Sequence, residues 1–155
     1  VDLVRTDTLS VELRLSVRAV LLAPIEVLAD RLCVSPGLVQ LQERMDHYKK
    51  LGLGRFATRK ELEEYSMMPI VQYIGMMAGV RLDETGRNIV LRLGCTPMWY
   101  LNGMPLRFEA GESIDQIVSM YDLEAIEVYK GAASLPPEYS GSTGQCGAVG
   151  LWTRR

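Results

Sequence analysis

The chain has 155 residues, a length that fits one modest domain with a working hydrophobic core. Hydrophobic residues make up 48% and charged residues 23%, which is typical of globular proteins and excludes a disordered or collagen-like chain. The 17 Lys and Arg residues are scattered and nearly balanced by 19 Asp and Glu residues, so we expect no nucleic-acid partner.

The first residues show no secretory signal, because charged side chains interrupt any apolar run, and the chain reads as a mature or trimmed fragment. The longest apolar stretch, residues 67–80, is shorter than the roughly 20 residues that span a bilayer, so we predict a buried helix and no transmembrane helix. Gly75 and Gly79 in this stretch form a G-x-x-x-G pair. We interpret the pair as one helix residue and a C-terminal cap rather than a helix-contact motif.

Residues 11–17 alternate apolar and polar side chains, which predicts a strand with one buried face. Residues 23–29 follow as an extended apolar and acidic segment around Ile25, Glu26, Val27 and Leu28. This segment has two interpretations: an ordinary strand or linker, or a strand that a partner protein captures by main-chain pairing.

A helix is predicted after the N-cap Ser35, with Pro36 at its first position and Gly52 at its end. Its apolar residues recur at spacings of three and four, which predicts one buried face; they are Leu38, Leu41, Met45 and Tyr48. His47, the only histidine, lies off this face and is interpreted as a solvated helix residue.

Short elements follow in the middle of the chain. Phe56 and Ala57 are predicted as extended, and Thr58 with Glu61 matches a capping box that begins a short helix. A second helix is predicted over residues 69–77, then a strand from Val80 and another over residues 89–93.

The last third of the chain carries the most specific pattern. Residues 98–101 are predicted as a strand that enters an Asn102-Gly103 hairpin turn, which is a strong two-residue turn signal. A short helix, a strand that ends before Lys130-Gly131, a loop rich in Gly, Ser and Pro, and a closing apolar strand complete the order.

This order resembles the plug domain of TonB-dependent outer-membrane receptors, over roughly residues 55–155. The family has a Tyr, an aliphatic residue, Asp or Asn and Gly at the hairpin, then a strand with the Ile-Glu-Val and Lys/Arg-Gly motifs, then a Gly-rich loop. One departure is Ala78, where the family has Pro. The positions that carry the resemblance are Tyr100, Asn102, Gly103, Ile126, Glu127, Val128, Lys130, Gly131 and Gly147.

The resemblance implies an α+β fold: a small mixed β-sheet of about four strands with short helices, extended at the N-terminus by a strand and a helix. We expect three parts. Residues 1–22 would be the terminal strand of a truncated carboxypeptidase regulatory-like β-sandwich, residues 23–54 a linker with the amphipathic helix, and residues 55–155 the plug-like domain.

The resemblance also implies a function and partners. A plug fills an outer-membrane β-barrel, helps to bind the incoming nutrient, and is rearranged by the periplasmic protein TonB. Residues 25–28 would then be a TonB box, and the location would be the outer membrane or periplasm of a Gram-negative-type bacterium. Because the chain ends where the family's first barrel strand would begin, the alternative is a stand-alone envelope module that binds or scaffolds through its edge strands.

Catalysis and cofactor binding find no support in the sequence. With a single histidine and no C-x-x-C, a catalytic triad and a zinc site are not expected, and Gly52-x-Gly54 lacks the context of a phosphate-binding loop. We expect neither an enzyme nor a metal or cofactor site. The carboxylates Asp115, Asp122, Glu124 and Glu127 are interpreted as solvated groups or as groups that stabilise helix ends.

Cys95 and Cys146 each precede a strand of the plug-like sheet that the resemblance implies. An oxidising periplasm would permit a disulfide between them, and two buried free thiols are the equal alternative. Cys33 is predicted to be a buried or partly buried free cysteine near the start of the helix.

Overall fold

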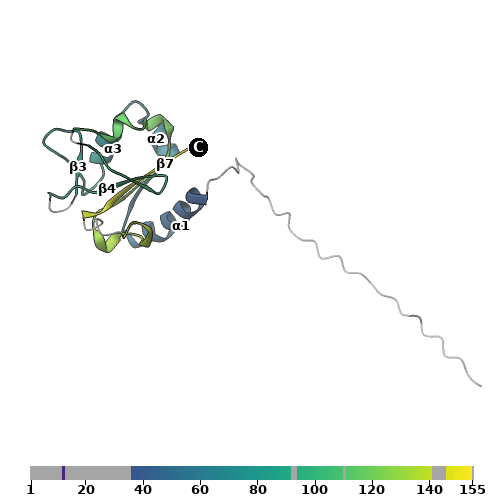
Figure 1. Cartoon of the computed structure of the whole chain (residues 1–155). Coiled ribbons are helices and arrows are strands. Elements are labelled where there is room, and N and C mark those ends of the chain that lie inside the picture. Colours follow the sequence, from purple (N-terminus) through teal and green to yellow (C-terminus); the bar gives the residue numbers. More distant parts are fainter. Residues whose placement is uncertain (1–11, 13–35, 92–93, 110, 141–145, 155) are drawn as a thin grey trace, which may run out of the picture. The chain divides into compact units, whose positions relative to one another are not determined.

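A computed structural model describes residues 12, 36–91, 94–109, 111–140 and 146–154 (Figure 1). Its helices and strands all belong to one folded unit, Cys33–Arg155, and they confirm the predicted α+β class. Most of the predicted strand at residues 11–17, the whole segment 23–29 and Cys33 lie outside the described residues.

A five-stranded mixed sheet forms the centre of this unit, in the order β1-β6-β7-β4-β5. β4 and β7 are parallel, and the other neighbours are antiparallel. The sheet has one strand more than the predicted four, because the short extended piece at Phe56 pairs along β6. The strands are β1 (Arg55–Thr58), β4 (Met98–Leu101), β5 (Met104–Leu106), β6 (Leu123–Tyr129) and β7 (Ala148–Thr153).

The hairpin between β4 and β5 has the predicted turn. Asn102 and Gly103 both have positive φ, 51° and 82°, as a type I′ turn requires. Because Leu101 and Met104 flank this two-residue turn, Tyr100 and Pro105 are the next pair along the ladder.

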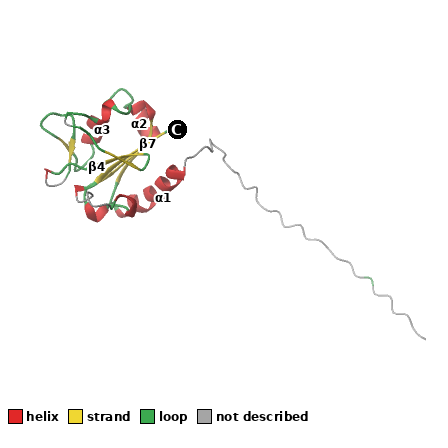
Figure 2. Cartoon of the chain, in the orientation of Figure 1, coloured by secondary structure: helices red, strands yellow, loops and turns green. Residues whose placement is uncertain are grey.

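Helices cover both faces of the sheet (Figure 2). One face is mainly aliphatic, with Ile126, Val128, Val149 and Leu151 buried in the main core beneath α2 (Arg59–Glu63) and α3 (Ile70–Gly75). The opposite face carries Ala125 and Trp152, which pack against Leu41 and Met45 of α1 (Pro36–Leu51). The two faces therefore differ in chemistry, and the aromatic face holds the polar groups described below.

α1 confirms the predicted helix. Leu41 and Met45 are buried, and His47 is exposed on the other side as expected. Gly52 has φ of 67°, and the N–H groups of Gly52 and Leu53 donate to the carbonyls of Lys49 and Tyr48. This is the Schellman arrangement that ends a helix at glycine.

The short helices begin at carboxylate caps. The backbone N–H of Thr58 donates to Glu61 at 2.7 Å, so the predicted capping box at α2 is confirmed. Asp115, from the 3₁₀ turn η2 (Ile114–Gln116), accepts from the backbone N–H of Ile70 at the start of α3. Its carboxylate therefore stabilises a helix end, as predicted, although the helix belongs to a distant part of the sequence.

The remaining elements connect these layers. β2 (Arg81–Leu82) pairs with β3 (Ile89–Val90) in a separate small sheet. β3 ends earlier than the predicted 89–93, and the N–H of Leu91, the residue after it, donates to the Cys95 carbonyl. Three further 3₁₀ turns are η3 (Met120–Asp122), η4 (Ala132–Ser134) and η5 (Pro137–Tyr139). None of the described helices combines the length and apolar composition needed to cross a bilayer.

Candidate functional site

A buried carboxylate lies at the centre of the aromatic face of the sheet. Glu127 of β6 is 0% exposed, and Arg44 of α1, which is 6% exposed, points at it. The Arg44 guanidinium donates twice, from Nε to Oε2 at 3.2 Å and from Nη2 to Oε1 at 2.9 Å. This bidentate, charge-assisted pair joins the helix to the middle of the sheet.

Three further donors complete the coordination of Glu127. The hydroxyl of Tyr129 donates to Oε2 at 2.8 Å, the indole Nε1 of Trp152 donates to Oε1 at 2.8 Å, and the hydroxyl of Tyr139 also donates to Oε1. We call these five residues the Glu127 cluster: Arg44, Glu127, Tyr129, Tyr139 and Trp152. The interpretation of Glu127 as a solvated strand carboxylate is therefore wrong.

Small residues make room for this cluster. Gly150 lies opposite Glu127 in the β6–β7 ladder, and Gly37 brings α1 so close to the sheet that an added Cβ would collide with the Trp152 ring. The Arg44 guanidinium lies 5.6 Å from the Tyr139 ring centre and 5.5 Å from that of Trp152. Stacking of this kind adds a cation–π attraction to the ion pair.

Burial and charge fix the protonation states of the cluster. Burial is the main reason why the pKa of Tyr129 and of Tyr139 is raised, and the neighbouring Glu127 charge raises both further. Burial alone would lower the pKa of Arg44, but its hydrogen bond to Glu127 and the carboxylate charge reverse this and raise it. Both hydroxyls therefore remain protonated donors, and the guanidinium remains charged at neutral pH.

The chemistry of the cluster is structural. Five donor groups satisfy one carboxylate that solvent does not reach, so no lone pair is left to act as a base on an outside molecule. Among the described residues, no group of His, Cys, Asp and Glu is placed to hold a metal ion. We conclude that the cluster ties α1 to the sheet.

Sequence reasoning missed Arg44, Tyr129, Tyr139 and Trp152 as members of this cluster. A signal for Arg44 was present, because it follows Leu41 by three positions and precedes Tyr48 by four, on the predicted buried face. No comparable signal exists for Tyr139, which reaches Glu127 from the loop between β6 and β7.

The motif at the end of β6 also has a structural role. Lys130 donates through Nζ to the carbonyl of Ala78 at 3.0 Å, joining β6 to the turn after α3. Gly147 has φ of 103°, and an added Cβ would collide with the carbonyl of Tyr129. Gly131 lies beside this contact.

Asn102 joins the hairpin to the closing strand. Its Oδ1 accepts from the backbone N–H of Thr153 at 2.9 Å, and its Nδ2 donates to the Thr153 hydroxyl at 2.9 Å. The motif position Asn102 therefore combines a turn conformation with a contact between β4 and β7.

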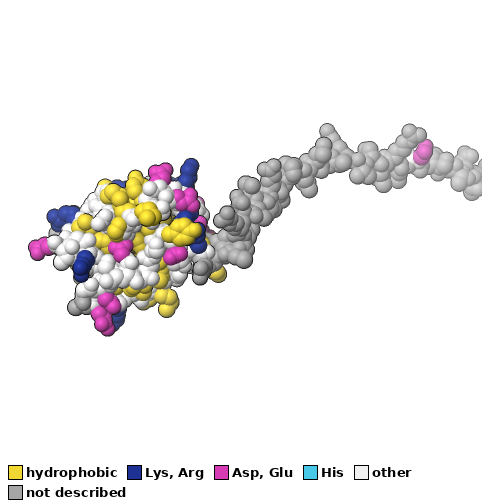
Figure 3. Space-filling model, turned by 90° about the horizontal axis from the view of Figure 1, so that it is seen from above, with side chains coloured by type: hydrophobic (Ala, Val, Ile, Leu, Met, Phe, Trp, Pro, Cys, Tyr) yellow, Lys and Arg dark blue, Asp and Glu magenta, His cyan; other side chains and the backbone are white. Residues whose placement is uncertain are grey.

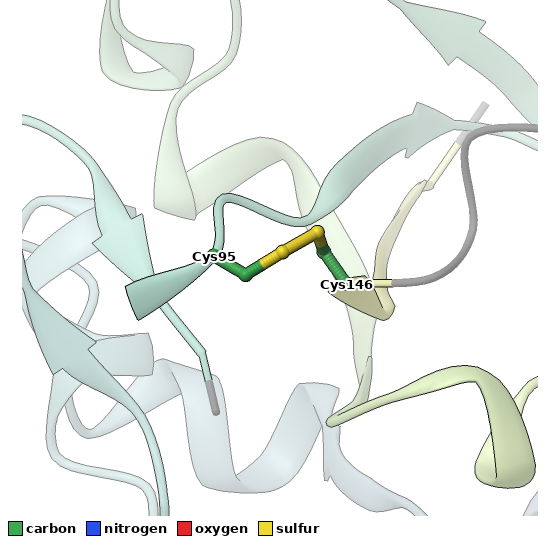
Figure 4. The surroundings of a disulfide bond; sticks show 2 residues. All are labelled: Cys95 and Cys146. Atoms are coloured by element: carbon green, nitrogen blue, oxygen red, sulfur yellow. A yellow bond between two sulfur atoms is a disulfide. The ribbon is translucent and has the colours of Figure 1, made fainter. Parts of the chain in front are cut away.

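Cys95 and Cys146 form a disulfide (Figure 4). Their Cα atoms are 5.4 Å apart, within the usual range for a disulfide. The bond joins the segment before β4 to the segment before β7. Of the two alternatives, a disulfide or two buried free thiols, the structure contains the disulfide.

Neither sign of charge dominates the face of the molecule seen in Figure 3. Charged side chains of both signs lie among apolar ones on the face seen in Figure 3. This distribution differs from the basic stripe that nucleic-acid binding needs. The proposed partner-binding residues Ile25, Glu26, Val27 and Leu28 lie outside the described part of the chain.

No protein-family model and no curated protein matches the chain. Solved structures do match. The siderophore receptor PirA from Pseudomonas aeruginosa is 24% identical, with a TM-score of 0.51 over 66% of this chain and 18% of the receptor. A mutant of the ferric enterobactin receptor PfeA from the same organism is 19% identical, with a TM-score of 0.55 over 72% of this chain and 18% of the receptor.

A third match is the structure of the FpvAI–pyocin S2 complex, at 21% identity and a TM-score of 0.50 over 66% of this chain and 14% of the matched chain. The chain thus has the fold of a small part of siderophore receptors and spans less than a fifth of their length. The matching proteins are receptors and not enzymes.

Proposed function

We propose that this chain is the plug domain of a TonB-dependent outer-membrane receptor, which gates nutrient uptake, contributes to ligand binding and performs no catalysis. The observation that carries the proposal is the shared fold with siderophore receptors over 66% to 72% of the chain. In this proposal the protein resides in the outer membrane of a Gram-negative-type bacterium, and a β-barrel surrounds the domain.

The arrangement of the motifs supports the proposal. The Asn102-Gly103 hairpin and the β6 strand with its Ile-Glu-Val motif lie far apart in sequence, yet both border β7 in one sheet. The motif positions that resemble the plug family thus form one structural unit. In this proposal, residues 1–22 are the terminal strand of a preceding carboxypeptidase regulatory-like domain.

A permeability measurement tests the function. The whole gene is expressed in an outer-membrane host, either intact or with residues 36–155 removed in frame. If the domain plugs a barrel, its removal opens a pore, and entry of a large antibiotic increases strongly over the intact protein. Equal antibiotic sensitivity of the two strains, with equal amounts of protein in the outer membrane, contradicts the proposal.

Residues 23–29 are the proposed TonB-binding strand. Main-chain pairing tolerates a change of side chain but needs backbone donors, so Ile25→Pro or Val27→Pro should abolish binding while Ile25→Val preserves it. Calorimetric titration of the chain with a TonB C-terminal domain measures this. Failure of the wild-type chain to bind, or Pro variants that bind as well as wild type, would overturn this role.

A further inference from the structure

A single side chain provides the polar attachment of α1 to the sheet. Among the described residues, every hydrogen bond and ion pair between α1 and the rest of the folded unit goes through Arg44, which contacts Glu127 and, at 4.0 Å, Glu138. No backbone hydrogen bond within the described ranges joins α1 to a strand. Of the 16 residues of the helix, only Leu41 and Met45 are buried together with Arg44. The attachment of α1 is therefore small and depends on one charged group.

Release of α1 would leave the rest of the fold in place. The main hydrophobic core lies on the opposite face of the sheet and contains no residue of α1. The helix contributes no strand, so its release breaks no pairing within the five-stranded sheet. The released segment would lose its helical structure, because an isolated helix of this length is marginal in water. We therefore expect α1 to open locally, at a lower free energy than global unfolding.

The face beneath α1 has the chemistry of a guanidinium site. Once the helix has left, the Glu127 carboxylate keeps its negative charge and three neutral donors, which are two tyrosine hydroxyls and the Trp152 indole. It then lacks a cation that donates two hydrogen bonds side by side. The Tyr139 and Trp152 ring centres, 5.6 and 5.5 Å from the Arg44 guanidinium carbon, favour a planar cation over a compact ammonium. Arg44 is thus the internal ligand of this site.

The neighbours of Arg44 define what else an occupant needs. Leu41 and Met45 pack against Ala125 and Trp152 of the sheet. They lie three positions before and one position after Arg44, so all three side chains leave the helix on one side. A segment that takes the place of α1 must therefore be an amphipathic helix with an arginine between two apolar residues at this spacing.

We propose that α1 is a releasable latch, by which we mean a helix that leaves the sheet while the sheet stays folded. The face it covers is a docking site for such an amphipathic helix of a partner protein, whose guanidinium replaces that of Arg44 on Glu127. α1 competes with the partner and keeps the site closed in its absence. This inference uses contacts within the folded unit and does not rest on the proposed plug function.

Hydrogen exchange on the whole ¹⁵N-labelled chain tests the release of α1. The amides of Leu41 and Met45, in the middle of the helix, should be at least about tenfold less protected than those of Ile126 and Leu151, at the centre of the sheet. Equal protection of the two pairs would mean that α1 opens only when the whole unit unfolds, and would overturn the latch.

A peptide of residues 36–51, added to the full chain, tests the docking site. The indole N–H signal of Trp152 reports binding, and Trp99→Phe identifies it as the signal that remains. Leu41→Ala loosens α1 but leaves the Glu127 cluster intact, so this chain should bind the peptide at least about tenfold more tightly than wild type. The same peptide with Arg44→Gln should bind about tenfold more weakly, because it lacks the guanidinium.

The peptide experiment can overturn the docking site in three ways. The native peptide may leave the Trp152 signal of the Leu41→Ala chain unchanged, or the Arg44→Gln peptide may bind as tightly as the native one. A dimer of the wild-type chain that Arg44→Gln dissociates would assign the site to α1 of a second copy and reject the partner helix. If Leu41→Ala does not fold, Met45→Ala loosens the same contact and replaces it.

Discussion

Gly150 lies directly opposite Glu127 in the β6–β7 ladder, and a Cβ added at Gly150 would come within 2.6 Å of Glu127 Oε1 and 2.8 Å of the Tyr139 hydroxyl. The missing side chain on one strand thus provides the space for the carboxylate on the next. This relationship explains how a sheet of ordinary spacing accepts a charged group at its centre.

Gly150→Ala should destabilise the fold by about 2 kcal/mol, because the methyl group overpacks the cluster. Urea unfolding measures the change. In a Glu127→Ala background the same substitution should cost clearly less, since the colliding carboxylate is gone. Equal costs in the two backgrounds would show that Gly150 does not act through Glu127.

Glu127→Gln should cost about 3 kcal/mol or more, because it removes the buried counter-charge of Arg44 and leaves only Glu138, which lies 4.0 Å away and is 52% exposed. Glu63→Gln is the matched control: Glu63 pairs with Arg59 at 2.9 Å, but its side chain is 59% exposed, so we expect a loss below about 1 kcal/mol. Both values come from chemical denaturation at neutral pH. A loss at Glu127 no larger than that at Glu63 contradicts the role of the ion pair.

Alkaline pH should destabilise the fold through the buried tyrosines. The pKa of Tyr129 and of Tyr139 is raised in the folded chain, first by burial and then by Glu127. Above a pH of about 10 the unfolded tyrosines lose their protons while the folded ones keep them. The stability that these two tyrosines contribute is therefore fully present below that pH and is lost above it, by about 1.4 kcal/mol per pH unit for each tyrosine.

Denaturation between neutral and alkaline pH in wild type and Tyr139→Phe tests this. The variant should lose part of the alkaline slope, whereas Tyr121→Phe, at an exposed ring, should keep it. An unchanged slope in Tyr139→Phe would reject the assignment.

Gly103→Val should clearly lower the melting temperature. A φ of 82° is strained for a β-branched residue, and this strain costs about 1 to 3 kcal/mol. Met104→Val, at the neighbouring exposed strand position, is the control and should have little effect. Differential scanning calorimetry gives both values. If the two variants melt alike, the turn does not depend on the positive φ of Gly103.

Cys95 and Cys146 should be recovered as one cross-linked peptide pair when protein made in an oxidising compartment is digested without reduction and analysed by mass spectrometry. Replacing both with Ala should destabilise the fold by about 4 kcal/mol on the chain-entropy model, since the bond closes a long loop. Free, alkylatable thiols at both positions would falsify the pairing in solution.

Local signals predicted the elements well. β4 and its hairpin follow from Asn102-Gly103, because few residue pairs other than Asn-Gly adopt positive φ twice in succession. α1 follows from its apolar spacing and from Gly52 at its end. In both cases the residues that specify the structure are neighbours in sequence.

Contacts between residues that are far apart in the chain could not be predicted from the sequence. Glu127 looked solvated because alternation alone does not reveal that both faces of β6 are covered, and the helix that covers one of them lies some 80 positions earlier, with Arg44 separated from Glu127 by 83 residues. The predicted strand 89–93 was too long, because β3 ends at Val90. The backbone N–H of Leu91 donates to the Cys95 carbonyl, and the apolar alternation of the sequence gives no sign of this hydrogen bond. The TonB-binding role of residues 23–29 stays a prediction.

Pro105 hinders the pairing of a further strand with β5, one of the two edge strands of the sheet. Leu101 and Met104 form the hydrogen-bonded pair beside the turn, so the nitrogen of Pro105 points away from β4 towards the open side of β5, where it has no hydrogen to offer. An incoming strand would find its central donor missing along this three-residue edge. Another chain that extends the five-stranded sheet would therefore pair with β1, the strand at the opposite edge. A stand-alone module that assembled through its edge strands would use β1 and not β5.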